Sequence, residues 1–386
     1  MGHLVARALL VNSPTNLKRS RWPATQPASR TFSIRETKEL IQDLFAPKPL
    51  LYWTDFLISV SVAYGFAAIY IMAPPFSVIQ VAAFLVSGAA LFRVGTFIHE
   101  IVHMSGRAMV GFRVAWNLVC GVPLLMHSLL YSNHLDHHNP RKHGTPADGE
   151  YLPLASSPTR ETVSYFAQVP ILPLLAIVRF LVAVPLSFLH PRLRRWLLER
   201  GSSYAINPYY RRAIPPTEPQ HLWIALDAVC FLWLAVIFIL VLKGLFTWTM
   251  VGLFYCLSTY SLALNWVRNL AAHRYANTGG EMTFAEQVEG SINIVRNSLV
   301  TLLLFPVGLR YHGLHHLFPS LPYHALGKAH RRLMTALPED SPYRRTCCPG
   351  FFTALRDLLR GARLAEKRGD DPMRLWRSAN AKIQPN

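Results

Sequence analysis

Four stretches of the sequence are long and apolar enough to cross a lipid bilayer as helices, since a helical span needs about 20 predominantly apolar residues. Two very short links, residues 74–77 and 243–248, join these stretches in pairs. The pattern predicts an all-α, multi-pass membrane protein with two transmembrane helical hairpins whose turns lie on the same side. The expected spans are residues 51–73, 78–98, 222–242 and 249–264.

The basic residues indicate which side of the membrane each segment occupies. The net charge is +18, and 35 of the 39 lysines and arginines lie in residues 1–50, 131–220 and 266–386. By the positive-inside rule, these segments and both termini are expected on the cytoplasmic side, and we predict a bacterial inner membrane. Because 51% of the residues are hydrophobic and only 16% are charged, the positive charge is interpreted as suited to a membrane surface, and no nucleic-acid partner is expected.

Two further apolar stretches, residues 114–130 and 163–189, are interpreted as interfacial or re-entrant segments. A single crossing by either stretch would place the histidine motifs before and after it on opposite faces of the membrane. This interpretation therefore depends on those motifs forming one site.

Three regions are expected along the chain. Residues 1–48 are predicted to be a polar cytoplasmic arm, with an interfacial helix that begins at the capping-box sequence Ser33-Ile34-Arg35-Glu36. Residues 49–335 are the predicted membrane domain with its cytoplasmic helical cap. Residues 336–386 are a basic cytoplasmic tail to which the sequence assigns no function.

Four clusters supply the candidate metal ligands. The chain has 16 histidines, and imidazoles at positions i and i+4 share one helix face, so that both can reach one metal region. All four clusters are expected near span ends on one membrane face, so together they can form a histidine-caged two-metal site. The clusters are His99-Glu100-Ile101-Val102-His103, His134-Leu135-Asp136-His137-His138, Asn269-Leu270-Ala271-Ala272-His273 and His312-Gly313-Leu314-His315-His316.

Carboxylates near these clusters suggest further roles. Asp136 and Asp148 could accept hydrogen bonds from the outer N–H groups of the imidazoles. Glu100 also fits a rival interpretation, in which the HExxH motif belongs to a zinc peptidase with Glu100 as general base, although the other clusters then have no role. The five cysteines show no CxxC spacing, so a thiolate site is not expected. The isolated histidines are expected not to bind metal: His3, His127, His143, His190, His221, His324 and His330.

The order HExxH, HxxHH, HxxHH around two hairpins resembles the integral-membrane fatty acid desaturase and hydroxylase superfamily, over residues 50–335. Residues 138–148, 268–291 and 311–324 look like its bacterial desaturase branches in particular. The resemblance implies two iron ions with O2 as co-substrate, and it implies that Asn269 contacts the metals through a water molecule. The metal ligands that it implies are His99, His103, His134, His137, His138, His273, His312, His315 and His316.

The expected chemistry is oxidation of a lipid. Removing hydrogen from an unactivated methylene needs a redox-active metal, a role that zinc cannot fill. The leading prediction is a di-iron, O2-dependent desaturase that introduces a double bond into the acyl chain of a lipid or acyl thioester. A hydroxylase or ketolase acting on an alkane, a carotenoid or another lipid is the alternative, and a non-catalytic metal-binding protein is a third possibility.

Electrons are expected to come from outside the chain. The sequence has no visible flavin, haem or iron–sulfur motif, so an external donor, either a ferredoxin or a small cytochrome with its reductase, is the predicted partner. The basic cytoplasmic face suits an acidic carrier of this kind. Binding of these charges to membrane lipid headgroups is the other interpretation.

Overall fold

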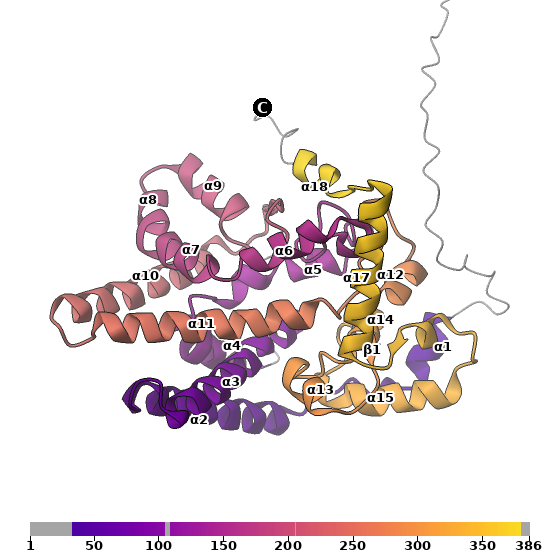
Figure 1. Cartoon of the computed structure of the whole chain (residues 1–386), viewed down its shortest axis with the longest axis horizontal. Coiled ribbons are helices and arrows are strands. Elements are labelled where there is room, and N and C mark those ends of the chain that lie inside the picture. Colours follow the sequence, from indigo (N-terminus) through magenta and orange to yellow (C-terminus); the bar gives the residue numbers. More distant parts are fainter. Residues whose placement is uncertain (1–32, 105–108, 205, 380–386) are drawn as a thin grey trace, which may run out of the picture.

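The structure is a computed structural model that describes residues 33–104, 109–204 and 206–379. It is mostly helical (Figure 1), as the sequence predicts. Within these residues the strands are short: β1 (Asn293–Ile294) pairs in parallel with β2 (Cys347–Cys348). Most of the expected N-terminal arm, including His3, lies outside the described residues.

Four long apolar helices are candidate membrane spans, and they coincide with the four expected stretches. They are α2 (Pro49–Met72), α3 (Val78–His103), α10 (Gln220–Leu242) and α11 (Trp248–Asn269). Leu257 of α11 is buried with Ala83 and Leu91 of α3. The two helices come close at Gly88, where an added Cβ would overlap the ring of Tyr260. Gly88 therefore permits direct contact between α3 and α11.

Two of these helices continue beyond their apolar stretches. α3 extends to His103 and α11 to Asn269, each about five residues past the expected end of the span. The first histidine cluster and Asn269 therefore lie on the same continuous helices that form the candidate spans.

The two stretches interpreted as interfacial or re-entrant are broken into short elements. A bend of 45° separates α6 (Thr159–Ala167) from the helices that follow it. This geometry fits either a broken span or a re-entrant loop, so the interpretation stays a prediction. Trp223 and Cys230 of α10 are buried against Phe180 in this region. The elements are α4 (Val110–Trp116), the π-helical η2 (Asn117–Gly121), η3 (Ser128–Tyr131), α6 (Thr159–Ala167), α7 (Leu172–Val178), the π-helical η5 (Arg179–Ala183) and α8 (Val184–Ser187).

Most of the remaining elements gather beyond the ends of α3 and α11, at the right of Figure 1. Ser33 caps α1, because its Oγ accepts a hydrogen bond from the backbone N–H of Glu36, as predicted. Ile41 is then buried with Leu314 and Leu333, so this N-terminal segment packs on the helices α14 (His312–Leu317) and α15 (Tyr323–Ala336). These elements are α1 (Ile34–Glu39), η1 (Gln42–Leu44), α5 (His134–His137), η4 (Leu154–Ser156), α12 (Phe284–Gly290), α13 (Leu299–Leu304), α14 (His312–Leu317), α15 (Tyr323–Ala336), α16 (Pro342–Arg345), α17 (Phe351–Arg368) and α18 (Met373–Ala379). The exception is α9 (Pro191–Arg200), which lies beside α8 at the upper left of Figure 1.

The basic C-terminal region packs on the same body. An added Cβ at Gly361 would lie 2.5 Å from the carbonyl oxygen of Ala155. Only glycine therefore permits α17 to approach η4 this closely. Trp376 of α18 is fully buried, and its Nε1 donates to the carbonyl of Tyr151 at 3.1 Å. These contacts join the tail to the loop that follows the second histidine cluster.

Candidate metal centre

Two short helices present histidines at the same spacing. α5 places His134 and His137 on one turn with His138 as its C-terminal cap, and α14 carries His312, His315 and His316. In both, positions i, i+3 and i+4 face the same side, so three imidazoles converge.

β1 fixes the position of α14. The side-chain oxygen of Asn293 accepts from the backbone N–H of Leu314 at 3.0 Å, and its amide donates to Thr346 at 2.7 Å. Gly313 fits beside Thr346, because an added Cβ would lie 2.9 Å from the threonine Cβ. The small parallel pair of strands thus determines where the fourth cluster, His312–His316, lies.

The first group of imidazoles lies at the end of α3. The ligand atoms of its four histidines are all within 4.8 Å of one another: His99, His103, His134 and His315. His138 joins the group, since its Nε2 is 3.0 Å from the Nε2 atoms of both His134 and His315.

The second group lies directly beside the first. Its ligand atoms also lie within 4.8 Å of one another, and they belong to His137, His273, His312 and His316. The ring centroids of His138 and His316 are 4.4 Å apart, so the two groups are adjacent. The structure thus brings together all nine histidines that the family resemblance singles out.

The hydrogen bonds of the second group leave its nitrogens suited to a metal ion. Nδ1 of His273 is 3.2 Å from Oγ of Ser291, which itself donates to the carbonyl of Gln287 and therefore accepts from the imidazole. Nδ1 of His137 donates to Asp148 at 2.8 Å. In the neutral rings both Nε2 atoms are then unprotonated, and they face each other at 2.9 Å.

That separation fits a shared cation. Two lone pairs at such a distance repel each other unless a positive charge lies between them. Two imidazole nitrogens bound at right angles to one ion, each at about 2.1 Å, are about 3.0 Å apart. The donor set is entirely imidazole, which suits iron as well as zinc.

Burial favours the neutral imidazoles that metals require. Burial, supplemented by neighbouring charges, holds the pKa of most of these histidines well below the ordinary value of 6.5: His134, His138, His273, His312, His315 and His316. Burial acts in the same direction on His137, but the adjacent Asp148 carboxylate outweighs it and raises the pKa of His137.

Two carboxylates orient the ligands, and the sequence prediction is right for only one of its two candidates. Asp148 binds His137, as predicted. Asp136 does not contact an imidazole, because its two oxygens bind Lys142 at 2.7 Å and Tyr210 at 2.9 Å. Glu150 takes the role instead, with Oε1 2.7 Å from Nδ1 of His134. In the sequence, the only indication of this role was that Glu150 lies two residues after Asp148, the other predicted partner of an imidazole.

The structure does not support Glu100 as a general base. Its carboxylate is buried and accepts hydrogen bonds from the hydroxyl of Tyr52 at 2.6 Å and the backbone N–H of Tyr323 at 3.1 Å. Glu100 therefore links α2, α3 and α15, which disfavours the peptidase interpretation of HExxH.

The i, i+4 spacing of the third cluster predicts that Asn269 and His273 share one face of a helix that continues the fourth span, and this prediction is wrong. α11 ends at Asn269, and His273 lies beyond a turn in an isolated β-bridge with Ser291, so the two residues do not share one helix. Asn269 is buried, and its backbone carbonyl accepts a hydrogen bond from the hydroxyl of Tyr275 at 2.7 Å. The prediction that Asn269 contacts the metals through water stays a prediction.

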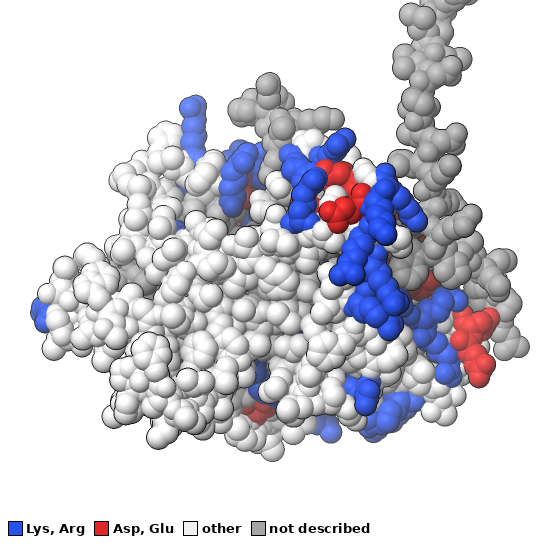
Figure 2. Space-filling model, viewed as in Figure 1, with Lys and Arg blue, Asp and Glu red and all other residues white. Residues whose placement is uncertain are grey.

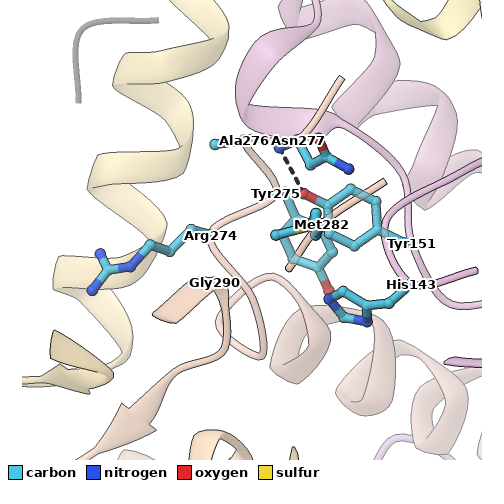
Figure 3. Close-up of a pocket in the computed structure, with 8 residues that line it drawn as sticks. All are labelled: His143, Tyr151, Arg274, Tyr275, Ala276, Asn277, Met282 and Gly290. Carbon is cyan, nitrogen blue, oxygen red and sulfur yellow. Dashed lines mark hydrogen bonds between the residues drawn. The ribbon is translucent and has the colours of Figure 1, made fainter. Parts of the chain in front are cut away.

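His143 was expected not to bind metal, yet it lies next to the second group. Its Nδ1 is 2.9 Å from the carbonyl of His137, and with His137 and Asp148 it forms a third set of possible ligand atoms within 4.8 Å of one another. It also lines a small cavity of about 90 Å³ beside Tyr151 and Arg274 (Figure 3). An isolated histidine in the sequence offers no signal for this placement.

Three other isolated histidines have partners elsewhere. His127 lies 3.3 Å from Asp227, His330 contacts Tyr343 at 2.7 Å, and His324 accepts from the backbone N–H of Lys48.

A cavity of about 1650 Å³ reaches the first histidine group. His99, Glu150, Arg268 and Asn269 line it next to the histidine groups, whereas α7, α10 and α11 supply mainly apolar walls. The lining continues to Trp248, near the turn between α10 and α11. Arg268 was not singled out from the sequence, in which it is simply a basic residue at the end of an apolar stretch.

Comparisons with known proteins agree with this geometry. A family model described as fatty acid desaturase matches residues 75–346. A protein of Caulobacter vibrioides (strain NA1000 / CB15N) described as a ceramide hydroxylase is 40% identical over 341 residues, which cover 87% of this chain and 95% of that protein. No solved structure matches the chain.

Proposed function

The chain belongs to the fatty acid desaturase family, and from this premise we propose that it is a membrane-bound, di-iron, O2-dependent hydroxylase of a ceramide-type lipid. One observation carries the proposal: nine imidazoles converge beside a large, mostly apolar cavity, which one of them, His99, lines. The similarity to a ceramide hydroxylase favours hydroxylation over the desaturation that ranked first from the sequence. Desaturation of an acyl chain is the second candidate, since both reactions begin with removal of hydrogen from a methylene.

The chain's own residues bind and orient the reactants. In the proposal, the nine histidines hold two iron ions, and Asp148 and Glu150 fix the ring orientations of His137 and His134. When bound, the iron ions supply O2 activation. Overall, one oxygen atom enters a C–H bond, and the other leaves as water with two electrons and two protons from an external donor. Apolar walls exclude bulk water and hold the lipid chain.

The proposed membrane arrangement follows from convergence of the ligands. His134 and His137 precede α10, and His273 and His312 follow α11, yet these four histidines lie in one site. An even number of crossings must therefore separate them, which favours two hairpins with a cytoplasmic cap and a re-entrant α6–α8 segment. The basic residues beyond the spans favour placing this cap on the cytoplasmic face of a bacterial inner membrane.

The C-terminal helix α17 is the proposed contact for the electron donor. Figure 2 shows basic side chains gathered over α17, and the family match ends at residue 346, before this helix begins. An acidic ferredoxin or small cytochrome complements this surface. The exposed basic residues of α17 are Arg356, Arg360, Arg363, Lys367 and Arg368.

Lipid analysis tests the proposed function directly. The full chain is expressed in a bacterium supplied with a ceramide of known chain lengths, and the extracted lipids are measured by mass spectrometry. A gain of one oxygen atom that is absent with His315→Ala supports hydroxylation. Loss of two hydrogen atoms instead would establish a desaturase, and an unchanged ceramide and acyl-lipid profile in cells with iron-loaded protein would contradict both.

A further inference from the structure

Arg268 is a buried cation beside the proposed metal centre. Among the described residues no carboxylate pairs with it within 4 Å, and the charge of Glu150 acts on it only from a longer distance. It is 6% exposed and lies in the last turn of α11, one residue before Asn269. Its Nη2 donates to Oδ1 of Asn265 at 2.9 Å, whereas its Nε is buried without a partner among the described residues. A buried guanidinium is stable only when its N–H groups find acceptors, so this position calls for an acceptor from a ligand.

The guanidinium lies at the wall of the large cavity. Asn265, Tyr204 and Glu150 line the same cavity, which also reaches His99 in the first imidazole group. This polar patch (Arg268, Asn265, Tyr204 and Glu150) is therefore next to the proposed metals. Elsewhere the lining of α7, α10 and α11 is mainly apolar.

The other two arginines that line the cavity are not equivalent to Arg268. Arg179 is paired with Asp227 at 2.9 Å and also donates to the carbonyl of Gly201. Arg200 is exposed, so water can satisfy its N–H groups. Arg268 is the lining arginine that combines burial with an unpartnered N–H.

The polar patch combines hydrogen-bond donors with an acceptor. Arg268 donates, whereas the carboxylate of Glu150 accepts from Tyr131 at 3.0 Å and from His134. A phosphate or carboxylate head would satisfy Arg268 but would meet the acceptor oxygens of Glu150. A neutral head with amide and hydroxyl groups offers acceptors to Arg268 and donors to Glu150.

We propose that Arg268, held by Asn265, binds an amide or hydroxyl oxygen of the lipid head, so that oxygen is inserted within a few bonds of the head and not in the middle of the chain. This inference rests on the proposed hydroxylase function and assigns the site of attack. The hydrocarbon tail extends along the apolar walls towards the turn between α10 and α11. Arg268 is thus a residue that determines substrate specificity and regioselectivity.

The test compares Arg268→Met and Arg268→Lys with the unchanged enzyme in iron-loaded, full-length form. The probes are a short-chain ceramide and an n-alkane that matches its longest chain. With ceramide, Arg268→Met should raise KM by about tenfold or more, the effect expected when a hydrogen bond to a charged group is lost. Its product should carry the hydroxyl group at scattered positions, located by tandem mass spectrometry. Arg268→Lys should recover part of the ceramide KM, and any alkane turnover should be insensitive to both changes.

The controls separate this inference from the proposed function. Iron content and thermal stability are measured for each variant, and Arg331→Met, an exposed arginine of α15, should behave as the unchanged enzyme. If the unchanged enzyme oxidises neither probe, the proposed function fails. If it hydroxylates ceramide in the middle of a chain, or if iron-loaded Arg268→Met keeps the ceramide KM and the position of the hydroxyl group, the role of Arg268 is wrong while the function stands.

Discussion

The carboxylate of Asp148 accepts a hydrogen bond from Nδ1 of His137 at 2.8 Å, and it is itself held by the backbone N–H of Gly144 at 3.0 Å. This arrangement fixes the imidazole ring of His137 so that its Nε2 faces the other histidines of the second group. Asp148 is fully buried, so water cannot replace it.

Replacing this carboxylate should weaken metal binding. Asp148→Asn is expected to lower iron affinity or activity by about 10- to 100-fold, the usual effect of losing a partner that orients a ligand. Iron per chain after competition with a graded chelator measures it. Asp136→Asn is the matched control, because Asp136 binds Lys142 and Tyr210 instead of a ligand. Equal iron loss in the two variants would contradict the assigned roles.

Removing one imidazole should be more severe. His315 lies 3.1 Å from His103 and 3.0 Å from His138, so His315→Ala takes a nitrogen from the centre of the first group. The purified variant is expected to lose most of its bound iron and its hydroxylase activity. His330→Ala, which removes a histidine that contacts Tyr343, should retain the iron. Full iron content in His315→Ala would exclude this residue as a ligand.

The Glu100→Gln variant distinguishes a lipid hydroxylase from a peptidase. In Glu100→Gln, the amide oxygen can still accept from the hydroxyl of Tyr52 and the backbone N–H of Tyr323. Iron content and lipid oxidation should therefore stay within about fivefold of the unchanged protein, since the net worth of one such hydrogen bond is about 1 kcal/mol and about 1.4 kcal/mol corresponds to a factor of ten. A complete loss of activity with metal still bound would show that Glu100 takes part in the reaction.

The contact between α3 and α11 should depend on a glycine. Gly88→Ala places a methyl group against the ring of Tyr260 and is expected to destabilise the folded state by about 1–3 kcal/mol. Gly65→Ala in α2 meets no atom within 4 Å and should be neutral or slightly stabilising, because alanine favours the helix. Thermal unfolding in one detergent compares the variants. Equal stability of the two would argue against tight packing at Gly88.

Electron delivery should depend on charge at α17. The double change Arg360→Glu with Arg363→Glu is expected to slow turnover with an acidic reduced ferredoxin by about tenfold at low salt, because steering by opposite charges is lost. The deficit should shrink as salt is added. Turnover driven by a small chemical reductant should be unaffected. Lys243→Glu, at the turn between α10 and α11, is the control on the opposite side of the proposed membrane.

Much of the architecture could be predicted because membrane helices satisfy their backbone hydrogen bonds locally. A run of about 20 apolar residues is sufficient to indicate a span, and all four expected stretches appear as long helices. The histidine spacing and the family resemblance also come from local order along the chain, and the family match confirms that resemblance. The detailed hairpin topology and the iron itself stay predictions.

The tertiary structure decided which side chains accept hydrogen bonds from the imidazole N–H groups of the candidate ligands. Asp136 is adjacent to His137 in sequence but turns to Lys142 and Tyr210, whereas Glu150 reaches His134 across a loop. His273 joins the site through its pairing with Ser291 and not through a continuation of α11.

The sequence by itself thus predicted the helical membrane class and the histidine clusters, because both are encoded in short-range spacing, and the family resemblance implied which nine imidazoles bind metal. Only the folded chain could bring a buried Arg268 to the wall of the cavity that reaches His99. Contacts between residues far apart in sequence depend on how elements pack, and no local pattern specifies them.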